Sequence, residues 1–168
     1  MQKTEKIKFF SFPELINEVS ARLVAFGVLA MSISSLILIN LENPIVIFVL
    51  CFLGYGFLAR VSSGPKISPL ALLVTKVIVP RLNFQEKLVP GAPKRFAQAI
   101  GLLMSLLILV SYLFGSTPTA SVLLVILIGF SFLESVLGYC FGCKVFKGLM
   151  KLGVIPSDVC EKCANFNY

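Results

Sequence analysis

The sequence contains no histidine, and only eight of its 168 residues are acidic, against fifteen lysines and arginines. Histidine therefore cannot serve as a general acid or base or as a metal ligand, and a metal site would need cysteine, carboxylate or backbone ligands. The sequence also lacks a glycine-rich phosphate-binding loop and any arrangement of a serine or threonine nucleophile with a base. Nothing in it indicates a common hydrolase or nucleotide-binding enzyme.

Apolar residues are abundant instead, at 57% of the chain, and the mean hydropathy is +0.94. This excess is too large for the core of one small soluble domain. Four runs are long and apolar enough to cross a bilayer as helices, at residues 23–40, 44–59, 96–114 and 120–139. Because short loops join the runs in pairs, we predict an all-α fold, a four-helix transmembrane bundle of two antiparallel hairpins in a lipid bilayer.

The basic residues indicate an orientation. None of the fifteen lies in the two hairpin loops, at 41–43 and 115–119, and all lie before, between or after the hairpins. Basic residues resist translocation, so we expect both termini and the middle segment to be cytoplasmic, in the inner (plasma) membrane of a bacterium. The net charge of +7 is explained in this way, and we expect no nucleic-acid partner.

The chain divides into five predicted segments. We expect interfacial helices near 12–20 and 69–79, the second starting with Ser68 as the N-cap and Pro69 at the first helical position. The segments are a cytoplasmic or interfacial N-terminus at 1–22, a first hairpin at 23–60, a cytoplasmic segment at 61–95, a second hairpin at 96–139 and a cytoplasmic cysteine-bearing tail at 140–168.

Two C-x-x-C pairs close the sequence. We expect Cys140 and Cys143 to continue the fourth transmembrane helix on one face, and Cys160 and Cys163 to lie on a new short helix. Sixteen residues separate the pairs, a spacing that matches a four-cysteine zinc site. In the reducing cytoplasm a permanent structural disulfide is not expected. The first hypothesis is therefore a zinc site that stabilises a module for docking a partner.

The alternative is a working dithiol for redox exchange or sulfur transfer. C-x-x-C is also a redox motif, and a helix N-terminus with nearby cations lowers a thiol pKa. In that case Cys160 would attack and Cys163 would resolve, with a soluble thioredoxin-like or sulfur-carrier protein as the partner. A third interpretation is that the cysteines only fill apolar space. The sequence leaves open whether the protein is an enzyme and whether it assembles with copies of itself.

Four charged residues could form buried ion pairs. Glu134 is the only carboxylate in the fourth span, and we expect it to pair with Arg22 or Arg95 near the cytoplasmic face. Alternatively, Glu134 could relay protons or support the thiols from nearby. Glu18 and Arg22 are spaced to pair with one another on one helix face.

Small residues in the spans indicate close helix packing. Gly54 and Gly56, and Gly101 with Ser105, suit contact between helices better than ligand binding. Cys51 lies in the middle of the second span, far from the other thiols, and we expect it to be a packing residue.

Five stretches together resemble a known family. They are FPELINEVSARL at 12–23, RVSSGPKISPLALL at 60–73, VPGAPKRFAQAIG at 89–101, LESVLGYCFGCKVF at 133–146 and VCEKC at 159–163. The sequence is similar in these stretches to the bacterial membrane family catalogued as domain-of-unknown-function family 4395. The resemblance implies a small multi-span membrane protein with a paired-cysteine tail, and it implies no reaction.

Overall fold

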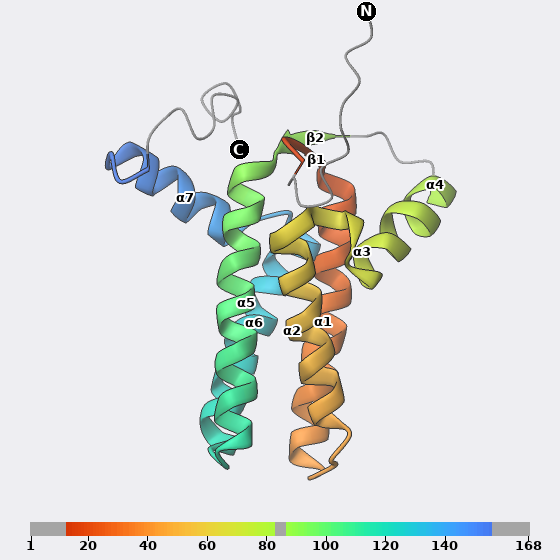
Figure 1. Cartoon of the computed structure of the whole chain (residues 1–168), viewed down its shortest axis with the longest axis vertical. Coiled ribbons are helices and arrows are strands. Elements are labelled where there is room, and N and C mark those ends of the chain that lie inside the picture. Colours follow the sequence, from red (N-terminus) through yellow and green to blue (C-terminus); the bar gives the residue numbers. More distant parts are fainter. Residues whose placement is uncertain (1–12, 83–86, 156–168) are drawn as a thin grey trace, which may run out of the picture.

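The computed structural model describes residues 13–82 and 87–155 (Figure 1). Four long helices dominate it, and each is long and apolar enough to span a membrane. They are α1 (Glu18–Asn40), α2 (Val46–Ser63), α5 (Gly91–Leu113) and α6 (Thr117–Leu137). The predicted four-helix transmembrane bundle is confirmed.

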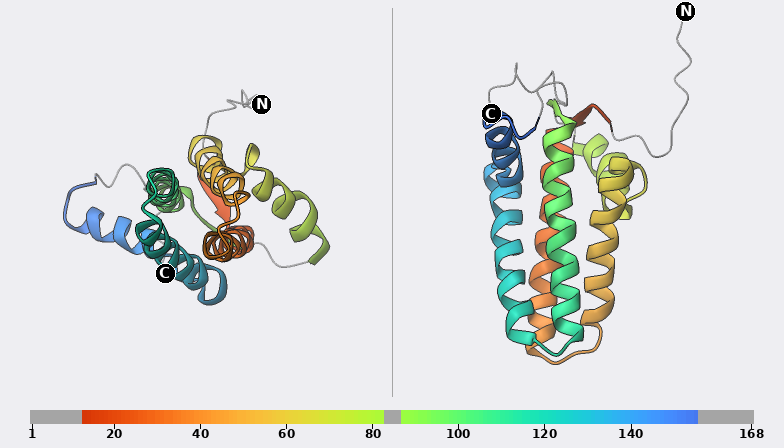
Figure 2. Two further views of the ribbon diagram at one scale, coloured as in Figure 1. Left: turned by 90° about the horizontal axis from the view of Figure 1, so that it is seen from below. Right: turned by 60° about the vertical axis from the view of Figure 1, so that its left-hand side comes forward.

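The two hairpins lie side by side, with both hairpin loops at one end and the shorter elements at the other (Figure 1). Helix α1 packs against α6, and α2 packs against α5, so each hairpin contributes one helix to each contact (Figure 2). Buried aliphatic side chains such as Leu50, Leu53, Ile108 and Leu124 fill the centre. Large apolar side chains such as Phe26 and Phe48 point outward, as expected of a surface solvated by lipid.

Small residues let α2 and α5 approach closely, as predicted. A Cβ atom built on Gly54 would lie 3.7 Å from the Oγ of Ser105, and one built on Gly101 would overlap the ring of Phe57. The prediction for Cys51 is wrong, because its side chain is exposed on the outer face of α2 rather than packed between helices.

A two-stranded antiparallel sheet replaces the helix predicted near 12–20. Strand β1 (Leu15–Asn17) pairs with β2 (Leu88–Pro90), and Leu15 lies opposite Pro90. Helix α1 starts only at Glu18, because the side chain of Asn17 caps it by accepting a hydrogen bond from the backbone N–H of Val19 at 3.0 Å. The sheet ties the start of α1 to the start of α5.

The second predicted interfacial helix is present and is longer than expected. After the 3₁₀ turn η1 (Gly64–Lys66), the helix runs through α3 (Pro69–Leu73), the π-helical turn η2 (Val74–Ile78) and α4 (Val79–Leu82). The π turn precedes Pro80, whose ring would clash with the carbonyl four residues earlier in a regular helix. Val24 of α1 packs against Ala71 and Val74.

Helix α7 (Phe141–Lys151) is a separate element that lies against α5. Phe146 packs on Phe96, with ring centroids 5.6 Å apart. At the contact Gly142 faces Ala97, and a Cβ atom built on Gly142 would lie 2.7 Å from the Cα of Ala97. The glycine of the Cys140–Cys143 motif is therefore required for close approach of α7 to α5.

Replacing Gly142 with alanine should push α7 away from α5. Because the new methyl group meets backbone rather than a flexible side chain, we expect the variant to lose about 1–3 kcal/mol of stability, measured by thermal unfolding in detergent. Gly148→Ala on the same helix is the matched control, since nothing lies within 4 Å of a Cβ at that position. Equal effects of the two substitutions would contradict this packing.

Candidate functional site

The cysteine pair Cys140 and Cys143 lies at the start of α7, not on the fourth transmembrane helix as predicted. Helix α6 ends at Leu137 because Gly138 adopts a left-handed conformation, with φ of 67°. Cys140 is then the N-cap of α7, and Cys143 lies in its first turn. The error has a physical cause, since one glycine redirects the chain just before the thiols.

The two thiols are in direct contact. The Sγ of Cys143 donates to the Sγ of Cys140 at 2.6 Å, and both side chains are buried. Both cysteines are free, and little movement would be needed to join them in a disulfide.

A buried ion pair lies beside the thiols. The Nζ of Lys94 on α5 is 2.6 Å from the Oε1 of Glu134 on α6, and the two side chains are 8% and 19% exposed. The predicted partners Arg22 and Arg95 are wrong. Arg22 donates instead to the carbonyl of Val136 at the end of α6, and Arg95 donates to the carbonyl of Val61.

The predicted pairing of Glu18 with Arg22 is also wrong. Glu18 pairs with Lys87 at 2.7 Å, just before β2. Arg22 on α1 instead donates hydrogen bonds to the carbonyls of Ser135 and Val136, and these bonds hold the end of α6 against α1. The guanidinium covers Gly138, with its Cζ 3.5 Å from where a Cβ would lie.

A cavity of about 420 Å³ opens onto the thiols. Both cysteines line it, as do the residues that connect α6 to α7, and the cations near it outnumber the acids. The charged residues in its wall are Glu18, Lys87, Lys94 and Lys144. Two of these lysines are compensated, since Lys87 pairs with Glu18 and Lys94 pairs with Glu134.

The electrostatics distinguish the two thiols. The hydrogen bond from Cys143 holds the pKa of Cys140 below its ordinary value, and the charge of Lys94 acts in the same direction, against opposing effects of burial and Glu134. Donating that hydrogen bond, together with burial, raises the pKa of Cys143. The N-terminus of α7 also favours a thiolate at its cap. Of the two thiols, Cys140 is therefore the one whose thiolate is favoured.

The second pair, Cys160 and Cys163, lies outside the described residues. Among the residues that are described, no group of three or more cysteine, aspartate or glutamate side chains is placed to hold a metal ion. The zinc ligation predicted for all four cysteines thus stays a prediction.

Sequence reasoning missed Lys94. The predicted third span began at residue 96, whereas α5 begins at Gly91, with Pro93 tolerated in its first turn. This earlier start places Lys94 on the helix, facing α6. The Pro-Gly-Ala-Pro stretch at 90–93 is typical of a turn, yet proline is also common at the start of a helix.

Four apolar helices with a thiol pair at one end define a multi-span helical membrane protein. The chain belongs to the family described as a domain of unknown function (DUF4395), which it matches over residues 16–151, so the resemblance seen in the sequence is confirmed. The matched region includes Cys140, Cys143, Lys94 and Glu134. No curated protein and no solved structure matches the chain.

The lowered pKa of Cys140 predicts reactivity at unusually low pH. In a protein with Cys51, Cys160 and Cys163 changed to serine, alkylation of Cys140 should reach its half-maximal rate below pH about 8.5, the usual thiol value. A lowered pKa leaves thiolate present at lower pH, so the rate profile moves down the pH scale.

Cys143→Ala in the same background removes the hydrogen-bond donor and should move the profile of Cys140 upward in pH. The denatured protein supplies the reference profile for an ordinary thiol. A native profile that coincides with the denatured one would contradict the assignment of Cys140 as the thiolate.

Proposed function

We propose that the protein is a membrane-bound dithiol that undergoes thiol–disulfide exchange with a soluble partner. One observation carries the proposal, namely that Cys140 and Cys143 are in contact at the N-terminus of α7 and face a cavity. A C-x-x-C pair at a helix N-terminus beside a lysine is the environment that lowers a thiol pKa and makes a cysteine reactive.

The exchange proceeds in two displacements. The thiolate of Cys140 attacks one sulfur of the partner's disulfide, forming a mixed disulfide and releasing the partner's other sulfur as a thiolate, which takes up a proton. Cys143 then loses its proton and attacks the Sγ of Cys140, so the partner's second thiol leaves. In sum, the partner's disulfide gains two electrons and two protons, and Cys140 and Cys143 become a disulfide.

The buried ion pair acts on the thiol of Cys140 in two opposing directions. Lys94 favours the thiolate of Cys140, while Glu134 opposes it, so the pair as a whole limits the charge acting on the thiol. Lys87 is paired with Glu18 in the wall of the same cavity, so it adds no net charge there.

We infer that the thiols face the cytoplasm. The α7 end of the bundle carries the basic residues of the described chain, and neither hairpin loop has one (Figure 1). In that compartment glutathione and thioredoxin keep thiols reduced. The resting protein would therefore hold the dithiol, ready to reduce a partner, in the inner membrane of a bacterial cell.

A zinc site formed by Cys140, Cys143, Cys160 and Cys163 is the second candidate. It is favoured by the fact that one helical turn presents two sulfurs to one cavity beside a cation. Two zinc-bound thiolates in a tetrahedral site lie about 3.8 Å apart, given Zn–S bonds of about 2.3 Å. A site of this kind also needs two further ligands, and Cys160 and Cys163, which would supply them, lie outside the described residues, so the contact of Cys140 with Cys143 carries the dithiol proposal first.

The dithiol can be tested by the stoichiometry of its reaction with 5,5′-dithiobis(2-nitrobenzoate). In the background lacking Cys51, Cys160 and Cys163, the protein should release two thionitrobenzoates and keep no adduct, because Cys143 resolves the first intermediate. Cys143→Ser should release one and retain an adduct on Cys140, seen by intact mass. Cys140→Ser should react at least about tenfold more slowly.

The complete chain provides the comparison with zinc. Stoichiometric zinc in the purified protein, with Cys140 reacting only after chelation, would reject the dithiol and support the metal site. The complete chain has five cysteines, so the comparison is the difference made by Cys140→Ser. A metal-free complete chain whose rapid release falls by two thionitrobenzoates in Cys140→Ser would support the dithiol.

A further inference from the structure

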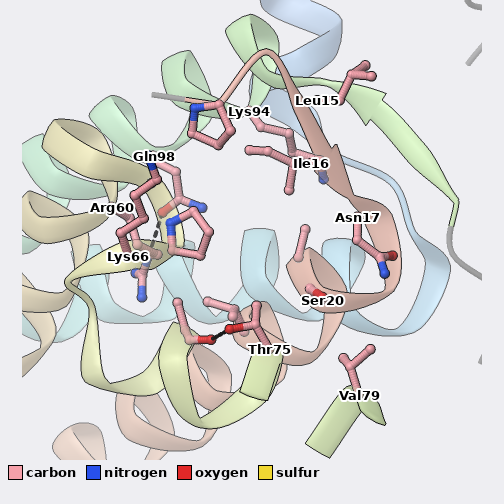
Figure 3. A pocket seen from close by; sticks show the side chains of 16 residues that line it. Leu15, Ile16, Asn17, Ser20, Arg60, Lys66, Thr75, Val79, Lys94 and Gln98 are labelled. Atoms are coloured by element: carbon pink, nitrogen blue, oxygen red, sulfur yellow. Dashed lines mark hydrogen bonds between the residues drawn. The ribbon is translucent and has the colours of Figure 1, made fainter. Parts of the chain in front are cut away.

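A second cavity, of about 320 Å³, is also lined by Lys94 (Figure 3). Strand β1 and the start of α1 form one wall, and the end of α2 with η1 and α5 forms the opposite wall, where Arg60, Lys66 and Gln98 are drawn together. Thr75 of the α3–α4 segment borders it as well. The cavity therefore lies where the bundle meets its interfacial elements, outside the thiol site.

The charged side chains that line this cavity in the described part of the chain are all positive. They are Arg60, Lys66 and Lys94, and none of the described aspartates or glutamates lines it. Lys94 is neutralised by Glu134, which lies outside the cavity wall. The two remaining cations give the cavity the character of an anion site.

Arg60 is buried with unused hydrogen-bond donors. Its side chain is 4% exposed, its Nε donates to the Oε1 of Gln98 at 2.8 Å, and its guanidinium lies over the ring of Phe57 at 4.5 Å. Both terminal nitrogens, Nη1 and Nη2, are buried and have no acceptor within the described part of the chain. Buried donors on a cation cost stability unless they are satisfied, and a guanidinium matches a phosphate group with two parallel hydrogen bonds.

The remaining wall is apolar. Four apolar side chains face the space, namely Ile16, Val24, Ala71 and Val79. A bare ion would not remove their apolar surface from water, so it would not stabilise them. The volume is also larger than a phosphate ion needs. An amphiphile, with a phosphate at Arg60 and an apolar part along α1 and α3, fits both kinds of wall. Anionic membrane lipid supplies that chemistry at the surface of the bilayer.

We propose that this cavity binds the phosphate group of an anionic phospholipid, with Arg60 as the buried anchor and Lys66 as the second cation. The site ties a lipid to the junction of β1, α2 and the α3–α4 segment. Nη1 and Nη2 are closed to solvent in this structure, so the side chain of Arg60 must turn toward the cavity to meet the phosphate. The bound lipid then stabilises the fold, because it satisfies donors that the chain alone leaves unpaired.

Thermal unfolding of the complete chain in neutral detergent tests the proposal. Added phosphatidylglycerol should raise the Tm by about 5 °C, whereas equal amounts of phosphatidylcholine should not, because it carries no net negative charge. Lys66→Gln should weaken the response to phosphatidylglycerol by about fivefold in midpoint concentration, while Lys76→Gln should leave it unchanged. Lys66 and Lys76 are both exposed, so neither variant is expected to unfold the protein.

Arg60→Lys should lose most of the response, because a lysine cannot make the paired hydrogen bonds. Equal stabilisation by the two lipids would overturn the proposal, as would an unchanged response in both Lys66→Gln and Arg60→Lys. The last comparison adds inorganic phosphate at the same concentration in place of the lipid. If it matches phosphatidylglycerol, the site binds free phosphate and the assignment to lipid is wrong.

Discussion

The Lys94–Glu134 ion pair is the contact on which the rest of this structure depends. It joins α5 to α6 at the end of the bundle where the chain changes direction. Two opposite charges that are largely removed from water must be held together, since either one left alone is costly. The pair thus fixes the end of α6, and with it the position of Gly138 and the start of α7, where Cys140 lies. The thiol site therefore depends on this contact between α5 and α6.

Lys94 also lines both cavities, the one with the thiols and the one with Arg60. The first contains two sulfurs in contact, and the second contains a buried guanidinium with unused donors. Both lie at the end of the bundle that holds the sheet and the interfacial helices. A reaction with a soluble partner and an attachment to membrane lipid would then take place on one face of the protein, with the ion pair between them.

The sequence predicted the spans, the hairpins and the α2–α5 contact, because long apolar runs and small residues act locally. It failed where distant residues decide the structure. Strand β1 needs β2 as its partner, about seventy residues away in the chain, so 12–20 was read as a helix. The cysteine motif was found from its spacing, but its place at a helix N-terminus depends on Gly138, and the partner of Glu134 depends on an earlier start of α5. The arrangement of Cys160 and Cys163 lies outside the described residues.

A double-mutant cycle on the ion pair tests this account most directly. Lys94→Met and Glu134→Gln alone should each lower the free energy of unfolding in detergent by about 3 kcal/mol, because each leaves one charge without its partner. The double variant should lose clearly less than the sum of the two single losses, because no charge remains alone. Single losses that simply add, or that stay within about 0.5 kcal/mol of zero, would contradict the central role of the pair.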